Sequence, residues 1–135
     1  MPSLLPLEGS EMSNPIDSVS PMEKGKFKIK QHEFKQAEQA FMEETKKNPD
    51  NHEAWYYIGF CRKRLYKIDE AVEPLEKAIR LNDKVPEYLY EMALTYRAVR
   101  QHTKAIDTAK KLQELEQDKY TTEQVSQLVQ LVSST

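Results

Sequence analysis

The fold of this chain follows from a stretch of 34 residues, His52–Val85, which reads HEAWYYIGFCRKRLYKIDEAVEPLEKAIRLNDKV. Its apolar residues recur at helical spacing in two groups, which predicts two amphipathic helices. The first group is Trp55, Ile58, Gly59 and Leu65, and the second is Ala71, Leu75, Ala78, Ile79 and Leu81. Between them, Tyr66-Lys67-Ile68-Asp69 is predicted to form a turn, with Asp69 as the N-cap of the second helix. The stretch therefore predicts a helical hairpin.

The same pattern returns at a fixed interval of 34 residues on both sides of this stretch. Small residues occupy corresponding positions: Gly25, Gly59 and Ala93 in the first helix of each unit, and Ala37, Ala71 and Ala105 in the second. Helix axes that cross about 8–10 Å apart leave no room for a bulky side chain at the crossing, so packed helices need small residues there. Self-similarity at one period indicates a repeat architecture.

This pattern resembles the tetratricopeptide repeat, in which a large apolar residue is followed by a small residue and then by an alanine at fixed spacing. That spacing is met by Trp55, Gly59 and Ala71 in one unit, and by Leu89, Ala93 and Ala105 in the next. The departures are Pro21 at the large apolar position, Lys28 and Arg62 where the family favours tyrosine, and Asp83 and Gln117 where it favours proline. The resemblance covers residues 18–119. It implies an all-α fold, a right-handed superhelical stack of three helix-turn-helix repeats.

The chain divides into five segments. Residues 1–17 hold three prolines and no helical period, so they are predicted to be a flexible tail. The repeats are assigned to residues 18–51, 52–85 and 86–119. After them, Thr121-Thr122-Glu123-Gln124 resembles a capping box, and Val125, Leu128, Val129 and Val132 follow at i, i+3, i+4 and i+7. Residues 120–135 are therefore predicted to be a helix that caps the last repeat.

Signals for individual helix starts support this division. Ser20 followed by Pro21 has the form of an N-cap and first helical residue, and Pro86 opens the first helix of the third repeat. Thr103 is predicted to cap the second helix of that repeat. Lys24–Lys30 alternates like a strand, but the repeat register favours a helix. In the tail, Leu4-Leu5-Pro6-Leu7 has the composition of a short docking motif, although a tail without a docking role is the simpler interpretation.

The composition argues against several classes of function. The formal net charge is −2 and 31% of the residues are charged, so the basic excess of a general nucleic-acid or membrane-surface protein is absent. One cysteine cannot form an intramolecular disulfide and suits a reducing compartment. No apolar run approaches the length of about 18 residues that spans a bilayer, and no secretory signal is evident. A cytoplasmic location is therefore expected.

No catalytic, metal or cofactor site is expected either. Cys61 lies in mid-helix without the histidine partner that would activate a thiol, so it is interpreted as a core residue. In a stack of hairpins, His32, His52 and His102 lie too far apart to share one metal. Three glycines leave no phosphate-binding loop, and Glu43-Glu44 is interpreted as an exposed pair on a helix face. We therefore predict that the protein is not an enzyme.

The first helix of each repeat is expected to line the concave face of the stack, which binds peptides in the family that this pattern resembles. Helical geometry assigns ten residues to this groove: Lys26, Ile29, Tyr56, Tyr57, Phe60, Lys63, Arg64, Tyr90, Leu94 and Arg97. They would form an aromatic and apolar strip with a basic margin, in which Tyr56 neighbours Tyr90 and Phe60 neighbours Leu94. The alternative is that these aromatic residues only fill contacts between helices.

Some proteins of this family bind the C-terminal carboxylate of heat-shock chaperones through a clamp of cations. The matching positions here are Met22, Lys26, Tyr57, Glu87 and Glu91, so two of the expected cations are carboxylates. Carboxylates repel a peptide C-terminus, which argues against this ligand.

The sequence predicts a non-catalytic interaction module, a scaffold or adaptor, that binds a peptide or helical segment of another protein through apolar anchors. A monomer or weak homodimer is expected. Two alternatives stay open, a small client-specific chaperone and a self-associating structural scaffold.

Overall fold

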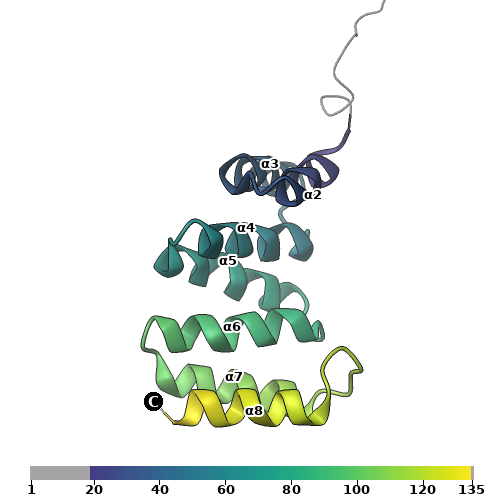
Figure 1. The fold of residues 1–135 in the computed structure, drawn as a ribbon. Coiled ribbons are helices and arrows are strands. Elements are labelled where there is room, and N and C mark those ends of the chain that lie inside the picture. The colour runs from purple at the N-terminus through teal and green to yellow at the C-terminus, as the bar shows by residue number, and fades with distance from the viewer. Residues whose placement is uncertain (1–18, 135) are drawn as a thin grey trace, which may run out of the picture.

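The computed structural model describes residues 19–134, which contain seven α-helices and no strand (Figure 1). The helices are α2 (Pro21–Lys30), α3 (Phe34–Lys47), α4 (His52–Arg64), α5 (Ile68–Leu81), α6 (Pro86–Ala98), α7 (His102–Glu114) and α8 (Thr122–Ser133). Each helix packs on the next one along the chain, and α8 contacts both α7 and α6. The predicted all-α stack of hairpins is confirmed. The predicted tail of residues 1–17, including Leu4-Leu5-Pro6-Leu7, lies outside the described residues.

Each of the three hairpins combines one A helix (α2, α4 or α6) with one B helix (α3, α5 or α7). Figure 1 shows the hairpins one above another, with the turn between α6 and α7 on one side of the stack and the connection from α7 to α8 on the other. The apolar core is built in two clusters. One is centred on Phe41 and Ile58 between the first two hairpins, and the other on Leu75, Met92 and Leu112 between the second hairpin and the C-terminus.

The repeated small residues are where the helices come closest together. Ala37, Ala71 and Ala105 are fully buried. A Cβ atom added at Gly59 would lie 2.6 Å from Cγ of Leu75, and one added at Gly25 would lie 2.5 Å from Cζ of Phe41. These distances are far below a normal carbon contact. The small residues of the sequence pattern are therefore required by the crossing of the A and B helices.

The turns between A and B helices share one unusual conformation. Three residues 34 positions apart, His32, Tyr66 and Arg100, have left-handed φ angles of 60°, 63° and 67°. In the second hairpin, the Tyr66 amide donates to the Lys63 carbonyl and the Lys67 amide donates to the Arg62 carbonyl. This hydrogen-bond pair is the Schellman ending of a helix, which usually has glycine at the left-handed position.

Because the turn closes so tightly, the B helices begin earlier than the sequence predicts. Helix α5 begins at Ile68 after Lys67, and α7 begins at His102 after Gln101, and neither has a side-chain cap. The predicted N-caps Asp69 and Thr103 are therefore wrong, and both residues lie inside the first turn of their helices. The predicted start of α2 is confirmed, because the Ser20 hydroxyl accepts from the Glu23 amide and Pro21 is the first helical residue.

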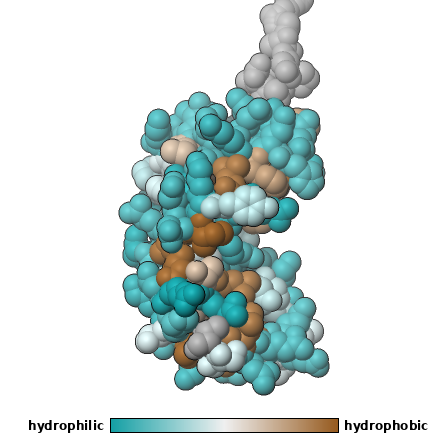
Figure 2. Space-filling view, turned by 60° about the vertical axis from the view of Figure 1, so that its left-hand side comes forward, coloured by the Kyte–Doolittle hydropathy of each residue, from teal (hydrophilic) through white to brown (hydrophobic). Residues whose placement is uncertain are grey.

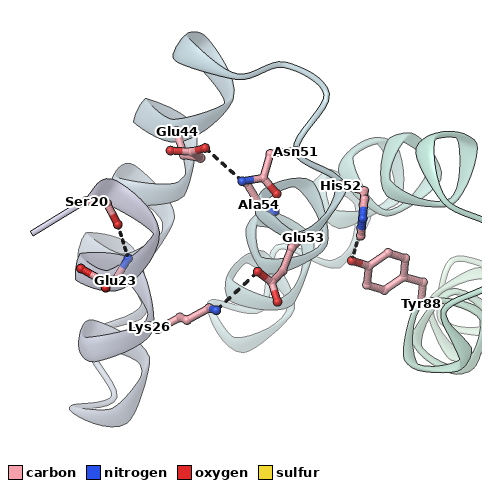
Figure 3. Close-up of polar contacts among 9 residues, drawn as sticks. All are labelled: Ser20, Glu23, Lys26, Glu44, Asn51, His52, Glu53, Ala54 and Tyr88. Carbon is pink, nitrogen blue, oxygen red and sulfur yellow. Dashed lines mark hydrogen bonds and ion pairs between the residues drawn. The ribbon is translucent and has the colours of Figure 1, made fainter.

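Glu44 organises the connection from the first hairpin to the second. Its side chain is buried, and one carboxylate oxygen accepts from the side-chain amides of Asn48 at 2.9 Å and Asn51 at 3.0 Å. Asn51 in turn caps α4 by accepting from the Ala54 amide (Figure 3). The interpretation of Glu44 as an exposed residue is therefore wrong. It failed because the helix position alone does not show that the following turn folds back over it.

Arg62 explains one departure from the tetratricopeptide pattern. Its Nε donates to Glu38 on α3 at 2.7 Å, and its Nη1 donates to the backbone carbonyl of Glu70 on α5 at 3.0 Å. That carbonyl would normally accept from residue 74, but Pro74 has no amide hydrogen. Arg62 therefore supplies the missing donor and ties three helices together.

The C-terminal helix is capped and packed as predicted. The Thr121 hydroxyl accepts from the Gln124 amide, and the Gln124 side chain accepts from the Thr121 amide, which completes the capping box. Val125, Leu128 and Val132 are buried against the last hairpin. Helix α8 thus covers the apolar face that α6 and α7 would otherwise expose.

Candidate peptide-binding groove

The ten predicted groove residues all lie on A helices. Lys26 and Ile29 are on α2, five are on α4 (Tyr56, Tyr57, Phe60, Lys63 and Arg64), and three are on α6 (Tyr90, Leu94 and Arg97). Residues three, four and seven positions apart share one face of a helix, so each helix presents its members together. Lys26 and Arg64 are exposed, and the other eight residues are half-buried. The set is therefore neither free surface nor core.

The aromatic rings contact partners that the sequence does not predict. Tyr56 stacks on Tyr88, with ring centroids 4.8 Å apart, and Tyr90 stacks on Tyr120 at 4.5 Å. Tyr120 is held in place by Gln117, whose side chain bonds both the amide and the carbonyl of Tyr120. The only sequence signal for Tyr120 is its position, 34 residues after Pro86 at the head of the next unit.

The remaining rings continue this chain of contacts toward the N-terminal hairpin. Tyr57 stacks on buried Phe41 at 4.8 Å, and Phe60 meets Phe34 edge to face at 6.3 Å. These rings therefore contribute to packing between repeats, which is the alternative interpretation that the sequence leaves open. Each groove ring is still only half-buried, so part of its surface is available for contact with another molecule.

Ion pairs between repeats neutralise much of the predicted basic margin. Lys63 on α4 pairs with Glu91 on α6 at 2.7 Å, and Lys26 on α2 pairs with Glu53 on α4 at 3.4 Å (Figure 3). Both pairs join neighbouring A helices. The lysines therefore fix one A helix against the next, and their charges are shared with carboxylates of the same face.

The two arginines of the predicted groove, Arg64 and Arg97, are not neutralised by ion pairs in this way. The Arg64 guanidinium lies over the rings of Phe34 and Phe60, at 5.1 and 5.7 Å from their centroids. The Arg97 Nε is buried and has no hydrogen-bond partner among residues 19–134. No carboxylate within the described part of the chain forms an ion pair with either arginine. Positive charge on the predicted margin is therefore concentrated on Arg64 and Arg97.

Burial raises the pKa values of Tyr56 and Tyr120, which therefore stay protonated at neutral pH. Burial, reinforced by the charge of Glu91, raises the pKa of Tyr56 well above its ordinary value of 10.0. Burial and the nearby Glu87 and Glu91 raise the pKa of Tyr120 to about 12. Neutral phenols donate and accept hydrogen bonds while their rings bury apolar surface, a combination that is enriched at protein interfaces.

Cys61 is a buried core residue, and His52 forms a contact between two hairpins. Burial raises the pKa of the Cys61 thiol to about 12, so it is not a nucleophile at neutral pH. His52 Nδ1 lies 2.6 Å from the Tyr88 hydroxyl and joins the second hairpin to the third (Figure 3). Across residues 19–134, no cluster of three or more histidine, cysteine, aspartate or glutamate residues is arranged to hold a metal.

Two other features of the surface are relevant to where a partner binds. Figure 2 shows hydrophobic residues gathered in a band down the side that carries the α6–α7 turn, with hydrophilic residues around it. A separate hollow of about 650 Å³ is lined by Ile79, Asp83, Lys84, Leu89, Lys111, Glu114, Leu115 and Glu116. It shares no residue with the predicted groove. No helix within residues 19–134 is long and apolar enough to cross a membrane.

Comparison with known sequences finds no matching family model and no matching curated protein. Comparison with solved structures finds close similarity of fold. The first tetratricopeptide domain of Spaghetti (RPAP3), bound to the HSP90 peptide SRMEEVD, has a TM-score of 0.76 and 18% identity, over 84% of this chain and 88% of that one. The Yersinia enterocolitica type III secretion chaperone SycD was solved in complex with a peptide of the translocator YopD. It has a TM-score of 0.76 and 15% identity, over 92% of this chain and 97% of that one.

The TPR2B domain of yeast Sti1, in a complex with pHsp70, gives a TM-score of 0.75 at 19% identity, over 84% of this chain and 94% of that domain. These similarities span nearly the whole of each compared domain, and they agree with the 34-residue period and with the small residues at the helix crossings. The chain therefore has the tetratricopeptide-repeat fold, with three helical hairpins and a C-terminal capping helix.

Proposed function

We propose that the protein is a non-catalytic interaction module that binds a peptide or short helix of a partner protein across its A helices. The observation that carries this proposal is the strip formed by Tyr56, Phe60, Tyr90 and Leu94. These residues are half-buried on adjacent A helices, although each of the two core clusters already has its own fully buried residues. Half-buried aromatic residues near the centre of a surface are typical of interface hot spots.

The structural relatives support the same use of the fold. RPAP3 was solved with a peptide of HSP90, and SycD with a peptide of YopD. PcrH, another protein of similar fold, was solved with the chaperone-binding region of PopD. Because SycD is described as a type III secretion chaperone, and PcrH was solved with a chaperone-binding region, a small client-specific chaperone is our second candidate function. Both candidates place an apolar segment of another protein on the same face.

The charges of the face favour apolar anchors over recognition of a C-terminal carboxylate. Glu87 and Glu91 occupy the positions where carboxylate-binding relatives of this fold are expected to have cations. Their partners Lys119 and Lys63 lie 3.8 and 2.7 Å away and are already engaged. A peptide carboxylate would have to compete with these glutamates for the lysines. The aromatic strip therefore carries the proposed affinity, and the arginines add a preference for acidic flanking residues.

The test begins with a pull-down that identifies a bound segment, followed by titration of that segment as a synthetic peptide. Tyr56→Ala combined with Tyr90→Ala should weaken binding at least thirtyfold, or by about 2 kcal/mol, because aromatic anchors commonly contribute that much. Both rings pack on the core, so chemical denaturation must show that the variant is still folded at the assay temperature.

Tyr66→Ala is the matched control. Tyr66 is 91% exposed on the turn between α4 and α5, outside the predicted groove. The control should bind normally. If it weakens binding as much as the groove variant does, or if the folded groove variant binds normally, the proposed surface is wrong.

A further inference from the structure

Two of the four cations among the ten predicted groove residues, Arg64 and Arg97, have no anion among the described residues. The other two, Lys26 and Lys63, each pair with a glutamate on a neighbouring A helix. Arg64 and Arg97 are not matched, and the Arg97 Nε is buried without a hydrogen-bond partner in the part of the chain that the structure describes. A buried N–H without a partner costs free energy, so an arginine in this state is suited to an acidic ligand.

The chain itself contains a segment with the complementary chemistry. Residues 1–18, MPSLLPLEGSEMSNPIDS, include Glu8, Glu11 and Asp17 and no lysine or arginine. They also include the apolar cluster Leu4-Leu5-Pro6-Leu7. Apolar anchors followed by carboxylates are what a half-buried aromatic strip with unmatched arginines would select.

The position of this segment allows it to reach the groove. It joins the structure at Val19, directly before α2, which is the first A helix. The 14 residues from Leu5 to Val19 can extend up to about 45 Å. Helix α6 is the second A helix beyond α2, a separation on the order of 20 Å for packed helices. Covalent attachment also gives the segment an effective concentration in the millimolar range, so even a weak contact is populated.

We propose that residues 1–18 bind within the same molecule to the face formed by the A helices. The leucine cluster contacts the strip of Tyr56, Phe60, Tyr90 and Leu94, and the carboxylates lie toward Arg64 and Arg97. This inference rests on the proposed function, because it makes the segment an internal competitor for the peptide site. A partner then has to displace the segment, which lowers the apparent affinity of the partner.

The labelling experiment uses the full chain and no partner. Ser3→Cys is labelled with a nitroxide, which reacts there selectively because Cys61 is fully buried. Line broadening is then measured by NMR on the methyl groups of isoleucine, leucine and valine. We expect strong broadening of Leu94 on α6 and Ile29 on α2, and little broadening of Val132 on α8 or Ile79 on α5.

Two sets of variants test the two kinds of contact separately. Replacing Leu4, Leu5 and Leu7 by glutamate should remove the selective broadening, and so should Arg64→Glu with Arg97→Glu. The leucine variant should also bind the partner peptide at least threefold more tightly than the unmodified chain.

Three results would overturn the proposal. These are broadening of Leu94 no greater than that of Val132, broadening that survives both sets of variants, and broadening that appears only when a labelled chain is mixed with a separate isotope-labelled chain. The last result would mean that the segment binds a second copy. Because no partner is present in the labelling experiment, the tail contact can fail while the groove still binds its peptide, and the reverse also holds.

Discussion

At the scale of single residues, Gly59 shows how one absent methyl group sets the distance between two helices. A Cβ there would lie 2.6 Å from Cγ of Leu75 and 3.3 Å from the backbone carbonyl oxygen of Ala71. Leu75 is fully buried, so it has little freedom to move away. The sequence predicts this position correctly because small residues recur at it in every unit.

Replacing Gly59 by alanine should therefore destabilise the protein, although alanine is the better helix former. Helix propensity favours alanine by about 1 kcal/mol, while overpacking typically costs about 1–3 kcal/mol. We therefore expect a net loss of up to about 2 kcal/mol in the free energy of unfolding, measured by urea denaturation. Glu73→Ala, on the exposed side of α5, is the control and should change stability by less than about 0.5 kcal/mol. A stabilised Gly59→Ala variant would mean that the hairpin is looser than described.

Cys61 gives a second prediction, for alkaline pH. Burial raises its pKa from 9.0 to about 12 in the folded protein. A raised folded pKa means that its contribution to stability is complete below pH 9 and is lost as pH rises toward 12. Between pH 9 and 10, this thiol should lower the free energy of unfolding by about 1 kcal/mol.

The comparison is between the pH dependence of the unmodified chain and that of Cys61→Ala. The alanine variant should be less stable at pH 7 but should lose about 1 kcal/mol less between pH 9 and 10. If the free energy of unfolding falls equally steeply with pH in the two proteins, the thiol is not buried as described. Tyr120, whose pKa is raised from 10.0 to about 12 in the folded state, is present in both proteins, so its contribution to the pH dependence cancels in this comparison.

At the scale of secondary-structure elements, the sequence predicts which segments are helical but misses where two of the B helices begin. The apolar period and the 34-residue register together identify all seven helices of residues 19–134. The starts of α5 and α7 are missed because Tyr66 and Arg100 adopt a left-handed conformation that glycine normally signals. The contacts of the site are missed for a related reason. Whether Tyr56 stacks on Tyr88 or on Tyr90 depends on side-chain orientation across two helices, which periodicity does not encode.

Helix α8 provides a prediction in which two leucines of one helix serve as test and control. Leu128 is 2% exposed and Leu131 is 41% exposed. Leu128→Ala should cost about 2–5 kcal/mol, because it removes buried contacts and leaves a cavity beside the last hairpin. Leu131→Ala should cost less than about 1 kcal/mol. Similar losses for both variants in chemical denaturation would show that α8 does not cap the stack in the orientation described.

At the scale of the whole molecule, the contacts that stabilise the stack lie on the same face as the proposed binding surface. Each hairpin contacts mainly its neighbours, so the A helices are fixed by ion pairs and ring contacts that run along the stack. The same residues were predicted from the sequence as a groove, since any residue on an A helix that avoids the B helix points to the inner face. Sequence reasoning therefore predicts which residues share this face, while the packing contacts of each ring are known only from the structure.

The most direct test of the groove is to map a bound partner segment by NMR on the methyl groups of the full chain. If the A helices form the binding surface, addition of the peptide should shift Ile29 on α2 and Leu94 on α6. It should leave Ile79 and Leu115, which line the separate hollow, at their original positions. The opposite pattern, with Ile79 and Leu115 shifted and Ile29 and Leu94 unchanged, would contradict the account.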